Sequence, residues 1–286
     1  MQRISSLIAK NALLGKQQLI NASKRGFSTR PTMGVGQSLA MGAGAAALCG
    51  LTYISYLGHR QLVTQKPGQT MSMFNPIVKD RINKTFGYFS GAIAGTGAMM
   101  YFLRNSSLMN MNPWLLLGLS VGSMIGTQLV DYNRNWALKN MLFTGFIGTM
   151  SLSLVPLIHM YSVPIIFDAA IASGAIMGSL GLVAYNSPSE QFLNWGGPLA
   201  IGLGGMLGVS LLSMLYPGSP ALHNMWLYGG LALFSAFTLY DTQKIIYRAK
   251  TDYVYDPINQ SLSIYMDAIN IFIRMVMILG GSNRNK

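Results

Sequence analysis

Hydrophobic residues fall into eight long runs that are separated by shorter polar connections. Each run is close to the ~20 residues that a helix needs to cross a bilayer. The pattern therefore predicts an all-α, polytopic membrane helical bundle, in which a seven-helix core follows one extra N-terminal transmembrane helix. The predicted helices are Val35–Leu57, Phe86–Leu103, Trp114–Val130, Leu138–Met160, Pro164–Tyr185, Gly196–Tyr216, Asn224–Tyr247 and Asn259–Leu279.

The longest connection between these runs is polar and basic and covers residues 58–85. It contains the turn-forming pairs Pro67–Gly68 and Asn75–Pro76. We expect it to be a linker loop between the additional transmembrane helix, residues 35–57, and the core, residues 86–286.

The first 30 residues differ from the rest, because apolar residues at helical spacing alternate with basic ones and no acid appears before Asp80. This pattern is typical of a mitochondrial presequence. We expect residues 1–27 to be cleaved near Phe27 or Ser28; a disordered basic tail is the alternative. The basic residues are Arg3, Lys10, Lys16, Lys24, Arg25 and Arg30.

Composition supports a membrane protein, since 51% of residues are hydrophobic and 10% are charged, against about 25% charged in soluble domains. The net charge of +12 does not indicate nucleic-acid binding, because the basic residues lie in the presequence and in short loops. Basic loops of this kind suit anionic lipid. The single cysteine, Cys49, excludes an internal disulfide.

Two aspartates lie inside the last two predicted helices. Asp241 is six residues before Tyr247, roughly 9 Å, and Asp267 is eight residues after Asn259, roughly 12 Å. Antiparallel neighbours would hold both carboxyls at similar depth. A carboxylate in a membrane span is costly and normally marks an ion or proton path. Such a pair can bind a hard divalent cation when charged, and close by sharing a proton when not.

Three further polar residues are candidate accessory groups. Asp168 lies near the start of its helix and is either a capping residue or part of a pore mouth. Asn270 and Arg274 follow Asp267 on the same helix face. Asp256 is expected to be solvated in a loop. The alternative for the aspartate pair itself is a buried polar network that only fixes helix register.

Catalytic motifs are not apparent. The three histidines lie at helix ends without metal-ligand spacing, and the chain contains no GxSxG, HExxH or P-loop sequence. We therefore expect neither an enzyme nor a bound cofactor.

Three segments resemble the transmembrane Bax inhibitor motif family. They are LYDTQKII from Leu239 to Ile246, DPINQSLSIYMDAINIF from Asp256 to Phe272, and GGPLAIGLGGMLGVSLL from Gly196 to Leu212. The similarity covers residues 86–279. The presequence and the extra first helix are similar to the mitochondrial branch of the family.

The resemblance implies a seven-helix core with the last helix central, and a calcium leak or calcium/proton exchange path gated by two aspartates that map onto Asp241 and Asp267. It also implies links with cristae organisation and apoptosis. Family members can carry a basic residue on the second core helix that closes the pore. Residues 114–130 hold none here, so Arg274 is the candidate substitute.

These observations predict a pH-sensitive calcium channel or calcium/proton exchanger of the mitochondrial inner membrane. Calcium ions and protons would be its ligands, with anionic lipid and other inner-membrane proteins as partners and no nucleic acid. The alternative is a structural membrane scaffold for cristae without intrinsic transport.

Overall fold

A computed structural model of the chain describes residues 75–187 and 190–284. The expected presequence with its cleavage near Phe27 or Ser28, the additional helix over residues 35–57 and most of the expected linker lie outside the described residues.

Seven long helices and no strand occur in the described ranges, which confirms the all-helical fold. Short helical pieces join some of them: η1 (Ser107–Asn110), η2 (Leu193–Trp195), α8 (Pro220–Asn224) and the π-helical segment η3 (Met225–Gly229). The long helices are α3 (Pro76–Leu103), α4 (Pro113–Leu129), α5 (Trp136–Met160), α6 (Val163–Asn186), α7 (Gly196–Leu215), α9 (Gly230–Thr251) and α10 (Pro257–Arg284).

Three of the helices begin with the same short device, an Asn or Asp followed by proline. The side chains of Asn75, Asn112 and Asp256 each accept a hydrogen bond from a backbone N–H of the first turn. Proline fits the first helical position because its missing N–H would have no partner there. The Asn75–Pro76 pair, interpreted from sequence as a turn, thus starts α3 ten residues before the expected Phe86, and the last part of the expected linker is helical.

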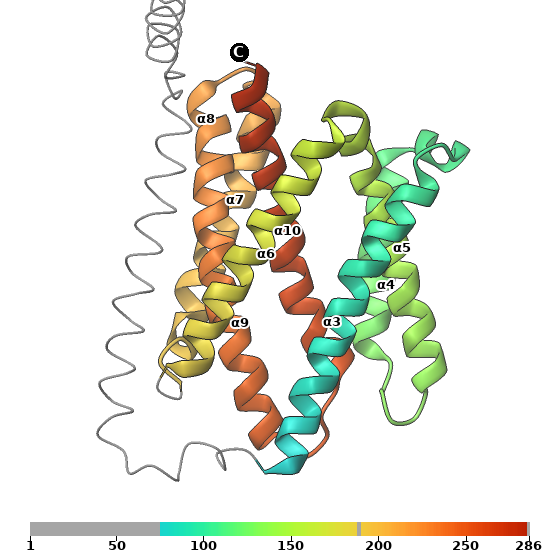
Figure 1. Cartoon of the computed structure of the whole chain (residues 1–286), viewed down its shortest axis with the longest axis vertical. Helices are drawn as coiled ribbons and strands as arrows, with labels where there is room; N and C mark the ends of the chain where they lie inside the picture. The colour runs from blue at the N-terminus through green and yellow to red at the C-terminus, as the bar shows by residue number, and fades with distance from the viewer. Residues whose placement is uncertain (1–74, 188–189, 285–286) are drawn as a thin grey trace, which may run out of the picture. The chain divides into compact units, whose positions relative to one another are not determined.

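The last helix, α10, runs through the centre of the bundle (Figure 1). It packs against α3, α6 and α9. Several of its side chains are fully enclosed, among them Ile258, Tyr265, Ile271 and Val276. Tyr265 forms an edge-to-face contact with Phe146 of α5, with ring centroids 5.8 Å apart. Polar side chains on α10 are therefore held inside protein, away from lipid.

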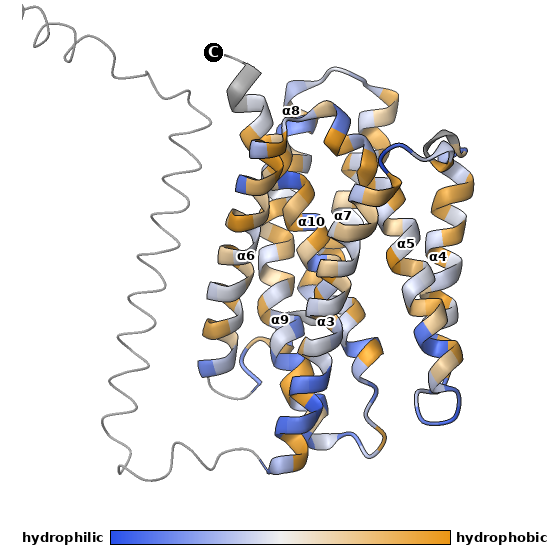
Figure 2. Cartoon of the chain, turned by 45° about the vertical axis from the view of Figure 1, so that its right-hand side comes forward, coloured by the Kyte–Doolittle hydropathy of each residue, from blue (hydrophilic) through white to orange (hydrophobic). Residues whose placement is uncertain are grey.

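Four of the described helices are long and apolar enough to cross a membrane: α5, α6, α7 together with η2, and α10. Many large apolar side chains point outward; Phe102, Leu129 and Ile201 are each about four-fifths exposed. Figure 2 shows hydrophilic residues gathered in the connecting loops and on the lower part of α3. A bundle with this apolar exterior is a multi-pass membrane protein.

Candidate functional site: a buried carboxyl pair

The two aspartates lie at the same depth on neighbouring helices. Asp241 is ten residues before the end of α9 at Thr251, and Asp267 is ten residues after the start of α10 at Pro257. This places each about 15 Å from the connection between the helices. α9 and α10 pack together, and the two carboxyl groups are within hydrogen-bonding distance. Their exposed fractions are 5% and 3%.

Donors around the pair are distributed unevenly. The Lys244 Nζ lies 3.6 Å from Oδ1 of Asp241, whereas the buried Oδ2 of Asp267 receives no hydrogen bond from any described donor. Two carboxyl oxygens attract each other only with a proton between them. The contact therefore requires one shared proton. Because the Lys244 ammonium favours the charged form of Asp241, a shared proton would belong to Asp267.

The pair is closed in this structure. Two hollows in the described part, of about 610 and 540 Å³, are lined by other residues. Within the described ranges no group of three or more His, Cys, Asp or Glu could hold a metal ion. Calcium takes about 6–8 oxygen ligands, more than two carboxylates supply. The arrangement therefore suits a transient ion that keeps some of its water, and does not suit a resident metal.

A glutamine beside the pair ties α9 to the connection between α6 and α7. Gln243 is 4% exposed. Its Oε1 accepts a hydrogen bond from the Phe192 backbone N–H at 2.6 Å, and its Nε2 donates to the Ala184 carbonyl at 3.4 Å. The turn of α9 that carries Asp241 is thus attached to both ends of a loop from another part of the chain.

Asn270 and Arg274 continue the polar face of α10 beyond Asp267. The Arg274 Nη1 donates to the backbone and side-chain oxygens of Asn270, at 2.9 and 3.0 Å, and its Nε donates to the Trp226 carbonyl at 3.3 Å. Arg274 is 3% exposed and forms no ion pair with a described residue. It therefore binds neutral groups and makes no ion pair with Asp241 or Asp267.

The guanidinium of Arg274 contacts two aromatic rings, with its central carbon 4.6 Å from the Trp226 centroid and 4.8 Å from the Phe234 centroid. The close approach depends on Gly230, where an added Cβ would overlap the guanidinium. Arg274 is seven residues from Asp267, about 10 Å along the helix. A fixed cation at this position stands on the side of the pair away from the α9–α10 connection.

Asp168 does not join the pair. It is an exposed residue in the second turn of α6. α6 starts beside the end of α10, since a Cβ at Gly280 would meet the Tyr161 ring. Asp168 thus lies towards the opposite end of the bundle from the α9–α10 connection.

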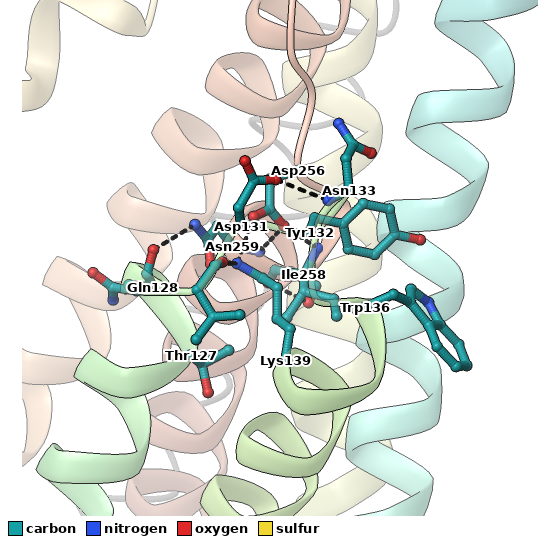
Figure 3. A network of polar contacts seen from close by, with 12 residues as sticks. Thr127, Gln128, Asp131, Tyr132, Asn133, Trp136, Lys139, Asp256, Ile258 and Asn259 are labelled. Carbon is teal, nitrogen blue, oxygen red and sulfur yellow. Dashed lines mark hydrogen bonds and ion pairs between the residues drawn. The ribbon is translucent and has the colours of Figure 1, made fainter.

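A second buried charge cluster was missed by the sequence analysis. Lys139 of α5 is fully buried and forms an ion pair with Asp256. Its Nζ also donates to the Val130 carbonyl at 2.7 Å and to Oδ1 of Asn259 at 2.9 Å. Figure 3 shows the side chain reaching from α5 towards Asp256 and Asn259. The prediction of a solvated Asp256 is wrong, because its side chain is only 20% exposed, pairs with Lys139 and accepts hydrogen bonds from the first turn of α10.

Another cation holds the same connection from α3. The Arg81 Nη1 donates to the carbonyls of Ala249 and Asp252, at 3.0 and 2.8 Å, and the guanidinium lies 5.4 Å from the Tyr255 ring centroid. The Tyr255 hydroxyl contacts Oγ1 of Thr85 at 2.6 Å. Burial raises the pKa of Tyr255, so this contact is made by a neutral phenol.

Comparison with known proteins agrees with this architecture. The family described as "Inhibitor of apoptosis-promoting Bax1" matches residues 78–285. The growth hormone-inducible transmembrane protein of Rattus norvegicus is 39% identical over 227 residues, which cover 73% of this chain and 65% of the rat protein. Bax inhibitor 1 of Arabidopsis thaliana is 28% identical over 180 residues, covering 53% of this chain and 72% of that protein.

A viral relative is also similar. The Golgi anti-apoptotic protein of Vaccinia virus is 26% identical over 193 residues, covering 67% of this chain and 79% of the viral protein. These relatives are named for apoptosis inhibition or for their place in a membrane. The family match takes in every long helix from α3 to α10, including both aspartates. The chain therefore belongs to the Bax inhibitor motif family of multi-pass membrane proteins.

Proposed function

We propose that the protein is a pH-sensitive calcium channel or calcium/proton exchanger whose ion site is the Asp241–Asp267 pair. One observation carries the proposal: two buried carboxyls from adjacent helices touch, and an oxygen of Asp267 lacks a described donor. Leaving a buried polar group unpaired costs stability. A network that served only to fix helix register would gain from satisfying it, as the Lys139 cluster does.

A single proton decides whether the proposed site is closed or can bind calcium. With the proton on Asp267 the carboxyls hydrogen-bond and the site stays closed. When the proton leaves, both groups are charged and repel each other. A calcium ion that enters between them then neutralises both charges. Each calcium bound thus releases the shared proton, and acid returns the proton and expels the ion.

Flux measured in proteoliposomes tests this proposal. The full chain should conduct calcium, and flux should fall as pH falls from 8 to 5.5, because protons compete for the same oxygens. Asp241→Asn and Asp267→Asn should each flatten this pH profile, since the switch belongs to the pair. Flux that survives both substitutions together would exclude the site, with Asp168 the next candidate.

A second candidate is a membrane scaffold that helps to shape cristae without transporting ions. The basic connections at one end of the bundle favour it, because they can bind anionic lipid and membrane protein partners. A wild-type protein that reconstitutes in folded form and conducts no calcium would favour the scaffold.

The proposed location is the mitochondrial inner membrane, which rests on residues 1–27. A role in apoptosis is proposed from the names of the Arabidopsis and viral relatives. Deleting Met1 to Phe27 should abolish mitochondrial import, since five basic residues and the amphipathic segment are lost. A truncated protein that still reaches the inner membrane would contradict the presequence.

A further inference from the structure

A lysine one turn from the carboxyl pair reaches it from the more accessible side. The Lys244 Nζ lies 3.6 Å from Oδ1 of Asp241, and the two side chains are 25% and 8% exposed. The ammonium is also 5.4 Å from the Tyr240 ring centroid. Lys244 is nearer than Asp241 to the end of α9 at Thr251. It thus bridges the partly open end of α9 and the enclosed carboxyl.

We propose that Lys244 is a tethered competitor for the ion site, a built-in monovalent cation that an incoming divalent ion must displace from Asp241. This inference rests on the proposed function and names the residue that sets the affinity and selectivity of the same site. Lys244 occupies one face of Asp241, and the shared proton occupies the side that faces Asp267. Together they neutralise both carboxylates, so the closed site carries no net charge.

Charge explains the selectivity. A sodium or potassium ion that replaced the ammonium would gain nothing, because one monovalent cation would take the place of another that is already tethered. A calcium ion can contact both carboxylates at once and neutralise them together. The lysine therefore disfavours monovalent ions and tolerates divalent ones.

Mobility makes displacement feasible. A lysine has a flexible four-carbon stem and a strongly hydrated ammonium, and the partial exposure of Lys244 lets it swing into water. Lys139 differs in both respects: it is fully buried and has three acceptors, so its side chain cannot move into water in the same way. The two lysines thus differ in whether their carboxylate partner can be released.

A purely structural salt bridge predicts a different outcome. Partly exposed ion pairs stabilise a fold by at most ~1 kcal/mol, so removing a structural Lys244 would lower stability slightly and leave calcium binding unchanged. Removing a competitor would instead strengthen calcium binding. The direction of the affinity change separates the two roles.

The experiment is calcium titration of the purified full-length protein by calorimetry, at constant pH and ionic strength. Lys244→Met should tighten calcium binding by about fivefold or more, since the competing ion pair is lost. Lys244→Arg keeps a tethered cation and should therefore show no such gain in calcium affinity. Lys79→Met, which removes an exposed cation at the same end of the bundle without contacting the pair, should leave affinity unchanged. Thermal unfolding of each variant checks that it is folded.

The dependence of calcium binding on monovalent ions provides a second test. When potassium replaces a large organic cation in the buffer at fixed ionic strength, calcium binding to the Lys244→Met protein should weaken by several-fold. Calcium binding to the wild type should barely change. Wild-type affinity in Lys244→Met, or equal potassium sensitivity in both proteins, would overturn the role of Lys244 and leave the carboxyl site standing. Calcium binding unaffected by Asp241→Asn would instead overturn the site and the inference together.

Discussion

The bundle contains two buried clusters of charged residues that differ in how completely their polar atoms are hydrogen-bonded. Around Lys139 every ammonium hydrogen has an acceptor, and Asp256 both pairs with the lysine and accepts from the backbone N–H groups of Ile258 and Asn259. Around Asp267 an oxygen is buried without a described donor.

This difference in hydrogen bonding distinguishes buried charges that stabilise the fold from buried charges that can change state. A buried ion pair with all partners satisfied resists change, because moving either partner leaves an uncompensated charge. A carboxyl pair held by one proton can change state whenever that proton is lost. The first cluster fixes the α9–α10 connection to α5, and the second lies ten residues further into the same helices.

The largest effect should come from breaking the satisfied cluster. Lys139→Met leaves Asp256 partly buried and unpaired, and should lower the free energy of unfolding by about 3–5 kcal/mol. Reversible denaturant unfolding in detergent measures the change. The double variant Lys139→Met with Asp256→Asn should recover part of the loss, because no unpaired charge remains; a double variant less stable than the single one would contradict this account.

A smaller loss should follow from removing one neutral acceptor of Lys139. Asn259→Ala deletes the Oδ1 that accepts from Nζ at 2.9 Å. A hydrogen bond to a charged group contributes about 1.5–3 kcal/mol, so unfolding free energy should fall by that amount while calcium binding is unchanged. Weakened calcium binding in this variant would show that the two clusters are coupled.

Substitution in the carboxyl pair should not lower the free energy of unfolding, in contrast to substitution in the Lys139 cluster. In Asp267→Asn the amide donates to Asp241 at any pH, so the unfolding free energy should stay level or rise by up to about 1 kcal/mol. Saturating calcium should raise the melting temperature of wild type, since ligands stabilise the state that binds them, and leave this variant unaffected. A strongly destabilised Asp267→Asn protein would mean that the pair is structural.

The smallest effect is expected at Thr242, next to Asp241. Its buried Oγ1 has no described hydrogen-bond partner. Thr242→Val replaces that hydroxyl by a methyl of similar size, so the unfolding free energy should change by less than about 1 kcal/mol, towards greater stability. A clear loss of calcium flux in this variant would instead identify the hydroxyl as an ion ligand.

Much of the fold and the central pair could be predicted from sequence, because both depend on local patterns. Runs of apolar residues predict the long helices, and two acids in such runs, at matching distances from one short connection, predict their own contact. The family motifs around Leu239–Ile246 and Asp256–Phe272 led to the membership that comparison confirms.

Long-range contacts explain what was missed. Lys139 falls inside the predicted helix Leu138–Met160, but its partners Asp256 and Asn259 lie about 120 residues away and no periodicity links them. The start of α3 was misplaced because an Asn–Pro pair suits a turn and a helix N-terminus equally well. In the sequence Lys244 is one of several basic residues near the end of a predicted helix, and only the folded structure brings its Nζ to 3.6 Å from Oδ1 of Asp241.

The Gln243 contact gives the protein a natural spectroscopic probe. A rotation of α9 that parts the carboxyls also moves the Gln243 side chain, and we expect it to open the hydrogen bond from the Phe192 N–H to Oε1 of Gln243. The amide proton of Phe192 should therefore exchange with deuterated water faster when calcium is bound than when the pair is protonated. One backbone amide on a loop would then report whether the ion site in the core is open.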